Sequence, residues 1–147
     1  MGVEPSLSRL GAGEQGACDL RHELARCGEK ADAGAHFLVT DVIYDLDATV
    51  RLLGELRGHG VELPVLAVLA QFSDSKAVMR RIHEVPGAAP ASRPAAARAG
   101  TDPVSAMVES VGLLRGLIAG VLIHPPAEPD DRMTSLVTEL AGLRWAS

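Results

Sequence analysis

The stretch His36–Asp47 reads HFLVTDVIYDLD and decides the fold prediction. Its first part is a continuous run of β-branched, aromatic and other apolar residues, which is typical of a strand buried on both faces. Helical patterns flank the run, and the order helix, strand, helix indicates a parallel α/β arrangement. Asp41, Tyr44 and Asp45 follow where the strand opens into a loop. Because ligands bind at the carboxyl ends of strands in such folds, we expect any functional site here.

Two further apolar runs, Val65–Ala70 and Gly120–His124, are predicted as buried strands. Gly34 is expected to end the first helix, and Asp102 followed by Pro103 to begin a later one. Apolar residues at helical spacing predict five helices, over Glu14–Ala33, Leu46–Gly58, Ser75–Val85, Pro103–Ile118 and Pro129–Leu143. The low-complexity section Pro86–Asp102 is predicted as a loop.

This alternation predicts the α/β class. We expect a partial (half) TIM-type (β/α) barrel or a small parallel sheet, with about three or four strands covered by about five helices. A closed eight-stranded barrel typically takes roughly 250 residues. Residues 1–14 are expected to form an extended N-terminal lead-in, and residues 15–147 a single domain. Such a sheet has open edges, so we expect a homodimer or a partner protein to cover them.

The composition limits the classes of partner. The chain has 147 residues, a net charge of −5 and 3% aromatic residues. Nucleic-acid surfaces need basic patches or aromatic stacking platforms, and anionic membranes need basic patches, so neither partner is expected. No apolar segment approaches the ~20 residues of a membrane span, and the N-terminus lacks a signal-peptide pattern. We expect a cytoplasmic protein.

The helical patterns also predict which side chains form the core. Cys27 falls on an apolar stripe and is predicted as a core thiol. The second predicted helix should bury one face, made of Leu46, Val50, Leu53 and Leu56. The last predicted helix should turn inward Met133, Leu136, Val137 and Leu140. The remaining histidines that fall in helical or turn contexts are predicted to be solvated: His22, His59 and His83.

Each predicted strand ends in a polar side chain: Asp41, Gln71 or His124. In a parallel sheet these ends lie on one side, where a carboxylate, an amide and an imidazole could bind a heterocycle or move a proton. The alternative is that polar residues simply mark where each strand leaves the core. No His, Cys, Asp or Glu residues have metal-ligand spacing, so no metal site is predicted.

A family resemblance lies in these same segments. Lys30–Asp41 reads KADAGAHFLVTD and is followed by Ile43-Tyr44-Asp45, which resembles the pattern K-V-x-A-G-A-x-F-x-I-T-Q, an aromatic pair and Asp of the methylenetetrahydrofolate reductase family. Three further segments are similar in order and spacing: GVELPV at Gly60–Val65, EVPG at Glu84–Gly87 and GVLIHPP at Gly120–Pro126. The resemblance covers roughly residues 18–143 and corresponds to the C-terminal half of that family's barrel.

The resemblance implies a flavin-dependent (β/α)8 barrel that reduces methylenetetrahydrofolate. Lys30 matches a lysine on the phosphate side of the flavin, and Asp41 takes the place of a glutamine that touches flavin and folate. Arg132 is the candidate for an arginine that holds the folate. The expected cofactor-binding residues are Lys30, Asp41, Tyr44, Gln71 and Arg132.

Several departures from the family pattern bear on activity. The resemblance lacks the family's N-terminal half, which carries the acid/base glutamate and most flavin contacts. At Asp41 a carboxylate replaces an amide, and an ionised carboxylate cannot donate a hydrogen bond. The family's Pro-Gly-Ile-x-Pro turn is replaced by Ala67–Gln71, and Arg80 stands where an aromatic residue is expected. We therefore expect this chain not to bind FAD by itself, and a tetrahydrofolate derivative to be its ligand.

Three hypotheses follow. The first is a folate- or pterin-binding or assembly subunit that works as a dimer or beside a partner chain. The second is an enzyme of altered chemistry, with Asp41 and His124 as an acid/base pair acting on methylenetetrahydrofolate or a related heterocycle. The third is a degenerate fragment with a structural role only.

Overall fold

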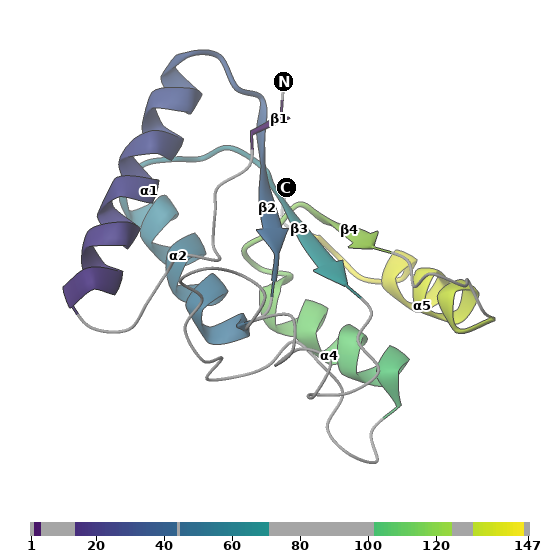
Figure 1. Cartoon of the computed structure of the whole chain (residues 1–147). Helices are drawn as coiled ribbons and strands as arrows, with labels where there is room; N and C mark the ends of the chain where they lie inside the picture. The colour runs from purple at the N-terminus through teal and green to yellow at the C-terminus, as the bar shows by residue number, and fades with distance from the viewer. Residues whose placement is uncertain (1, 4–13, 44, 71–101, 125–130, 146–147) are drawn as a thin grey trace.

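Four parallel strands form one sheet in the computed structural model, which describes residues 2–3, 14–43, 45–70, 102–124 and 131–145 (Figure 1). The strands are β1 (Gly2–Val3), β2 (Phe37–Val42), β3 (Val65–Ala70) and β4 (Gly120–His124), and their order in the sheet is their order in the sequence. The predicted α/β class with a small parallel sheet is confirmed. β1 lies inside the predicted lead-in and was not expected, because two residues carry no periodicity.

Four helices are described beside the sheet: α1 (Glu14–Asp32), α2 (Leu46–Gly58), α4 (Pro103–Leu114) and α5 (Asp131–Ala141). Their bounds match the predicted helices within a few residues. Gly34, with φ +92°, follows α1 as expected, and Ala35 N–H donates to the carbonyl of Lys30 at 3.0 Å. The predicted helix Ser75–Val85 lies outside the described residues. None of the described helices is both long and apolar enough to span a membrane.

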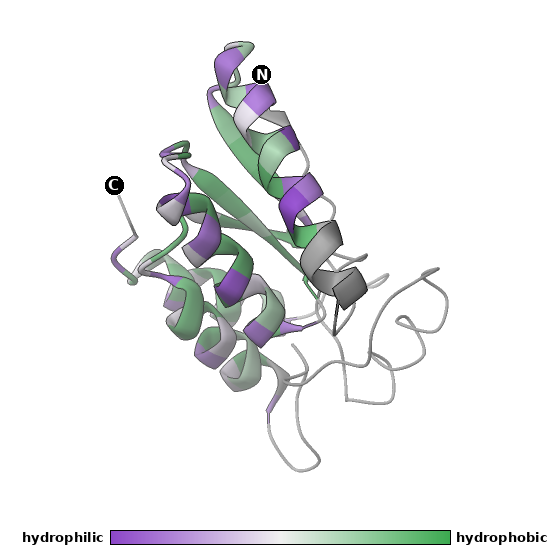
Figure 2. Cartoon of the chain, turned by 90° about the vertical axis from the view of Figure 1, so that its left-hand side faces the viewer, coloured by the Kyte–Doolittle hydropathy of each residue, from purple (hydrophilic) through white to green (hydrophobic). Residues whose placement is uncertain are grey.

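The helices cover one face of the sheet. Parallel strands joined by right-handed crossovers in sequential order place every crossover on the same side. The contacts agree, because α1 packs against α2, α2 against α4 and α4 against α5. We call the side of the sheet on which the helices pack the helix-covered face. Figures 1 and 2 show the helices beside the strands.

Alternate strand residues supply the core beneath the helices. Leu38 and Ala67 have no exposed surface, and Leu69 is 2% exposed. They belong to one cluster with buried residues of the helices, among them Leu24, Cys27, Leu52, Leu53, Val111, Leu114, Leu136 and Leu140. Figure 2 shows that the strands are coloured as hydrophobic and that the helices beside them alternate between hydrophobic and hydrophilic residues. The predicted core thiol at Cys27 is confirmed.

One of the predicted core positions, Val50, is wrong, and another, Val137, faces β4 without being buried. Val50 is 36% exposed and Val137 is 54% exposed. In α2 the buried position is Leu52, with no exposed surface, because the helix turns its 49–52–53–56 side to the sheet rather than the side that contains Val50. In α5 only Leu136 and Leu140 are buried.

The intervening strand residues form the opposite face of the sheet, defined here by Val39, Leu66, Val68 and Leu122. The register pairs Val39 with Leu66 and Val68 with Leu122, so these side chains belong to one alternate set. None of them is part of the core cluster beneath the helices. Leu122 is 45% exposed. The opposite face is therefore apolar.

Candidate functional site

A β-bulge interrupts β2 near its carboxyl end. Val39 is paired with Leu66, and the next pairing joins Val42 to Val68. Thr40 and Asp41 therefore stand opposite the single residue Ala67, one residue more on β2 than on β3. Bulges re-aim a strand, and they are over-represented next to active sites. The bulge thus determines the position of the Asp41 backbone in the strand.

The side chain of Thr40 closes the bulge. Its Oγ1 accepts a hydrogen bond from the backbone N–H of Val68 at 2.9 Å, and Thr40 is 1% exposed. The ladder resumes beyond it, where the N–H of Ile43 donates to the carbonyl of Val68 at 2.9 Å. Without the hydroxyl the N–H of Val68 would lose this buried partner at the bulge. The sequence analysis missed Thr40, since only the strand register distinguishes it from any other buried threonine.

The loop after β2 leads into a capped helix. Asp45 is the N-cap of α2, and its Oδ1 accepts from the N–H of Asp47 at 3.0 Å and of Ala48 at 3.1 Å. The hydroxyl of Thr49 donates to the carbonyl of Asp45 at 2.8 Å. Asp45 thus has a structural role, since its carboxylate satisfies the first N–H groups of the helix.

Three of the predicted site residues lie at the same edge of the sheet, the carboxyl ends of the strands. Asp41 is half-buried in β2, and His124 ends β4, where it is paired with Ala70. Arg132 lies exposed in the first turn of α5, the helix that follows β4. The structure describes only the backbone at His124. The parallel strand direction therefore puts these residues at one edge, while their part in a functional site stays a prediction.

Asp41 and His124 are not on neighbouring strands, because β3 lies between β2 and β4. The register sets Val42 level with Leu122, two residues before His124. With strands about 4.8 Å apart and a rise of about 3.3 Å per residue, their Cα atoms lie roughly 13 Å apart. The two side chains could act on different atoms of one ligand at that separation.

Of the other predicted cofactor-binding residues, the structure describes only Lys30, which is not at this edge. Lys30 is in the last turn of α1, which leads into the amino end of β2. About 13 Å of strand separates Phe37, the first residue of β2, from Asp41. Tyr44 and Gln71 lie outside the described residues. The role of Lys30 stays a prediction, and its helix end faces away from the carboxyl edge.

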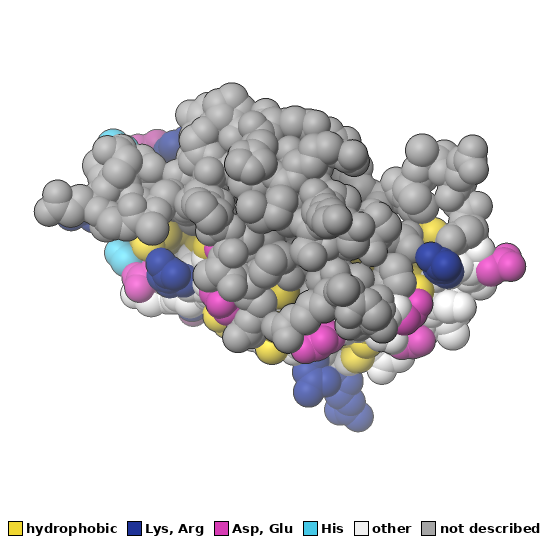
Figure 3. Space-filling view, turned by 60° about the horizontal axis from the view of Figure 1, so that its bottom comes forward, with side chains coloured by type: hydrophobic (Ala, Val, Ile, Leu, Met, Phe, Trp, Pro, Cys, Tyr) yellow, Lys and Arg dark blue, Asp and Glu magenta, His cyan; other side chains and the backbone are white. Residues whose placement is uncertain are grey.

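The charges at the carboxyl edge bear on the kind of ligand. Crossover helices begin at this edge, and a helix N-terminus attracts anions through its unpaired N–H groups. Here the chain's own carboxylates take those groups, Asp45 at α2 and Asp102 at α4, where Ser105 N–H donates to Asp102 Oδ2 at 2.9 Å. Figure 3 shows acidic and basic side chains interspersed over the described part of this face. These two helix ends do not fit a dinucleotide diphosphate.

Cys27 is buried away from this edge. Burial, and to a smaller extent the neighbouring Glu23 carboxylate, raise the pKa of its thiol to about 11. Glu23 is itself buried and accepts a hydrogen bond from Arg26 at 3.2 Å. A thiol held in its protonated form is a poor nucleophile, so Cys27 is a packing residue. Within the described ranges, no three His, Cys, Asp or Glu side chains are arranged to hold a metal ion.

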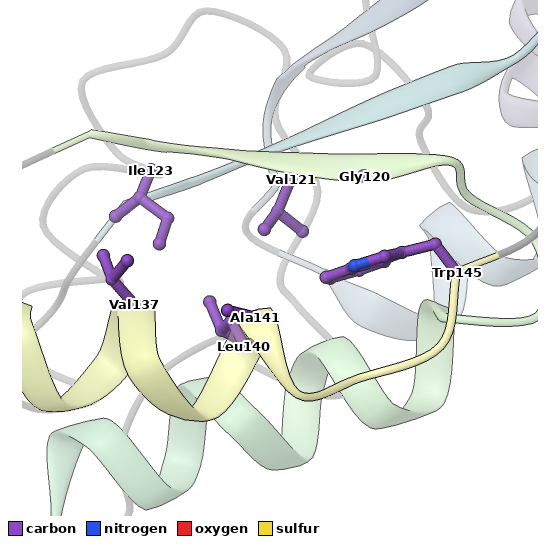
Figure 4. Close-up of a pocket in the computed structure, with 7 residues that line it drawn as sticks. All are labelled: Gly120, Val121, Ile123, Val137, Leu140, Ala141 and Trp145. Atoms are coloured by element: carbon purple, nitrogen blue, oxygen red, sulfur yellow. The ribbon is translucent and has the colours of Figure 1, made fainter.

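An apolar groove of about 330 Å³ lies between β4 and α5 (Figure 4). Val121 and Ile123 point from the strand toward Val137 and Leu140 of the helix, and the ring of Trp145 lies beside the start of β4. The groove is on the helix-covered face, apart from Asp41. The sequence analysis did not single out Trp145, although a lone tryptophan after an amphipathic helix is a signal for an apolar contact.

Comparison with known proteins identifies the family. The family model for methylenetetrahydrofolate reductase matches residues 9–95, more than half of the chain. A relative from Saccharomyces cerevisiae, methylenetetrahydrofolate reductase 2, is 27% identical over 63 residues, which are 43% of this chain. That stretch is 10% of the relative, so the chain corresponds to a small part of it. The residues matched by the family model include Lys30 and Asp41, while His124 and Arg132 lie beyond them.

The match covers the segment that contains β2 and its bulge, and the resemblance at Lys30–Asp45 is confirmed by it. This chain belongs to the methylenetetrahydrofolate reductase family.

Proposed function

We propose that this chain is a folate- or pterin-binding subunit of its family, assembled as a dimer or with a partner chain. We further propose that it does not catalyse flavin-dependent reduction on its own. The observation that carries the proposal is the position of Asp41, at the bulge of β2, on the carboxyl edge and inside the matched residues 9–95. The proposed ligand is a tetrahydrofolate derivative.

The chemistry of a pterin suits a carboxylate at this position. The aminopyrimidinone edge of the ring presents neighbouring N–H donors, and an ionised carboxylate is an acceptor with two oxygens. Two parallel N–H···O bonds give both strength and a fixed orientation. Thr40, adjacent to Asp41, is held by its 2.9 Å hydrogen bond to Val68, so the backbone that carries the carboxylate is supported.

Two observations support the absence of flavin chemistry. Asp45 and Asp102 accept from N–H groups at the starts of α2 and α4, so these donors are not available to the diphosphate of FAD. Lys30, which the resemblance assigns to the flavin phosphates, belongs to the helix end that leads into the amino end of β2. A carboxylate-rich edge favours a ligand that offers N–H groups over one that offers phosphates.

Calorimetric titration with tetrahydrofolate tests the ligand. Saturable binding is expected for the native chain, and Asp41→Asn should weaken it by at least tenfold, because a hydrogen bond to a charged group contributes about 1.5–3 kcal/mol. Asp47→Asn is the matched control, a half-buried carboxylate in the first turn of α2, and its affinity should stay within about twofold. The proposal fails if no saturable binding occurs, or if both variants bind equally.

The absorption spectrum of the purified protein tests the flavin statement separately. We expect no flavin band, and none after incubation with FAD and removal of the excess. A band that persists would overturn this part of the proposal and favour a reductase.

A second candidate function is an enzyme of altered chemistry, favoured by the placement of Asp41 and His124 at one edge of the sheet. At roughly 13 Å they would act on separate atoms, one accepting and one donating a proton. Turnover of methylenetetrahydrofolate, followed by product analysis, should then fall about 10²-fold in both Asp41→Asn and His124→Ala. Unchanged turnover in both variants would exclude this reading.

We also propose a single domain over residues 15–147 and a cytoplasmic location. One core cluster runs from α1 to α5, which supports the first statement. Cys27 is a free buried thiol, which suits a reducing compartment.

A further inference from the structure

We infer that Thr40 is a positioning residue for ligand binding. Its hydroxyl holds the bulge of β2, and the bulge keeps the carboxylate of Asp41 out of the apolar opposite face of the sheet. This inference rests on the proposed function, in which Asp41 accepts from the N–H groups of a pterin, and it adds the residue that places that carboxylate. Its starting point is the change of register within β2.

A strand without the bulge would put Asp41 in a different place. Val39 is level with Leu66, so an uninterrupted count sets Asp41 level with Val68. The structure instead sets Val42 level with Val68. Side chains of a strand alternate between its two faces, and level residues of neighbouring strands share a face. The bulge therefore puts a valine where a regular strand would put the aspartate.

The face that Asp41 would otherwise enter is apolar. Val68 is 8% exposed, and Val39 and Leu66 are half-buried. An ionised carboxylate among these side chains would lose much of its hydration, which is costly unless a partner compensates for it. In the structure Asp41 is only half-buried. Asp41 thus retains surface that a ligand can reach.

The residue that follows confirms the one-residue shift. In a strand without the bulge, Ile43 would point away from the helices, but it is 1% exposed and belongs to the core cluster beneath them. The N–H of Leu38 donates to the carbonyl of Pro64 at 2.8 Å, and a regular ladder counted from this bond joins the N–H of Val42 to the carbonyl of Val68. The N–H of Ile43 makes that bond instead, at 2.9 Å.

The hydroxyl of Thr40 makes a hydrogen bond that only the bulged strand contains. The regular ladder would join the N–H of Val68 to the carbonyl of Thr40, whereas in the structure this N–H donates to Thr40 Oγ1 at 2.9 Å. Thr40 is 1% exposed, so the bond is shielded from water. Removing the hydroxyl therefore destabilises the bulged strand relative to the regular one, and the carboxylate of Asp41 moves with the strand.

Calorimetric titration of the full chain with tetrahydrofolate tests the positioning role, with the folded fraction fixed by circular dichroism. Thr40→Val should bind about tenfold more weakly or worse, because hydrogen bonds to a displaced carboxylate are lost. Thr40→Ser keeps the acceptor oxygen and should restore the affinity to within about threefold of the native chain. Thr40→Cys, whose sulfur is a weak acceptor, replaces the valine variant if that variant does not fold.

A second buried threonine provides the matched control. Thr49 is 2% exposed, and its hydroxyl donates to the carbonyl of Asp45 at 2.8 Å in the first turn of α2. Thr49→Val removes a buried hydroxyl of the same kind without touching the bulge, so its affinity for tetrahydrofolate should stay within about twofold of the native value.

A double-mutant cycle tests whether Thr40 acts through Asp41. In an Asp41→Asn background, Thr40→Val should weaken binding by no more than about twofold further, because the carboxylate that it would displace is already gone. A loss of affinity that is equal in both backgrounds overturns the inference. A Thr40→Val variant that binds within about twofold of the native chain also overturns it.

Nuclear magnetic resonance measures the register without a ligand. The methyl groups of Val42 and Val68 should show a nuclear Overhauser contact in the native chain and in Thr49→Val, since level residues lie about 4.8 Å apart on one face. The contact should weaken or disappear in Thr40→Val, and its persistence at native intensity overturns the inference. A native chain that binds no tetrahydrofolate contradicts the proposed function, and the register then decides the inference. Native binding with an unchanged register in Thr40→Val contradicts the inference alone.

Discussion

Thr40 and Val68 are joined across two strands by a side-chain hydrogen bond where a backbone bond would normally stand: Thr40 Oγ1 accepts from Val68 N–H at 2.9 Å. The bond lies at the bulge that places Thr40 and Asp41 opposite Ala67. The buried hydroxyl of Thr40 therefore stabilises the pairing of β2 with β3 at the bulge, next to Asp41, the candidate ligand-binding carboxylate.

Replacing this hydroxyl should destabilise the fold. Thr40→Val leaves the N–H of Val68 without its buried acceptor, and we expect the free energy of unfolding to fall by about 1–3 kcal/mol. Thr40→Ser keeps the acceptor and removes one methyl group, so it should lose less. Urea unfolding followed by circular dichroism measures both; equal losses would show that the hydroxyl contributes nothing beyond its volume.

The cap of α2 gives a second prediction. Asp45→Ala removes the oxygen that accepts from the N–H groups of Asp47 and Ala48, and it should cost about 1 kcal/mol of stability. Asp45→Asn retains a capping oxygen and should cost only a few tenths. Thermal unfolding of the two variants, compared with the native chain, provides the measurement, and a larger loss in the Asn variant would contradict the capping role.

Neighbouring leucines in α4 separate burial from helix propensity. Leu114 has no exposed surface, and Leu114→Ala should cost about 2–5 kcal/mol through lost burial and the cavity it leaves. Leu113 is 43% exposed, and Leu113→Ala should change stability by about 0.5 kcal/mol or less. Both replace leucine by alanine in the same helix turn, so similar losses would mean that α4 is not packed as described.

The Cys27 thiol predicts a specific alkaline instability. Its pKa is about 11 in the fold against 9.0 in the unfolded chain, so the unfolded state releases the proton first as the pH rises. Stability from this group is complete below pH 9 and is lost between pH 9 and 11, by about 2–3 kcal/mol. Cys27→Ala should start less stable but lose less over that interval, as chemical denaturation at several pH values would show.

The same burial predicts slow chemistry at Cys27. In a Cys18→Ser background, a thiol reagent at pH 8 should modify the protein only as fast as the fold opens, and rapidly in urea. Immediate modification under native conditions would contradict the buried position.

The strands and most helix limits could be predicted from local patterns. Val65–Ala70 and Gly120–His124 are strands with the predicted ends, since a continuous apolar run between turn residues carries its own limits. Val50 was placed wrongly, because a helix turns inward the side that its neighbours cover, and that choice depends on tertiary packing. Val137 faces β4 as predicted, but it lines an open groove and stays 54% exposed. β1 exists only through its pairing with Phe37 and Leu38, which no local pattern contains.

The candidate site likewise has some features that could be predicted from the sequence and others that could not. That Asp41 stands near the carboxyl end of a strand follows from the sequence HFLVTD and the parallel class. The bulge does not, since it is a difference in residue count between two strands that are far apart in the sequence. Lys30 entered the expected site through a family pattern, and chain direction places it at the other end of β2.

The order of the strands also has a consequence for how the chain folds. Leu38 pairs with Val65 and Leu66 pairs with Gly120, so the second pairing closes a loop twice as long as the first. Each doubling of loop length adds only about 0.6 kcal/mol of closure entropy. By closure entropy alone, the β3–β4 connection can lengthen or shorten with little effect on stability, and closing it costs about 0.6 kcal/mol more than closing the β2–β3 connection.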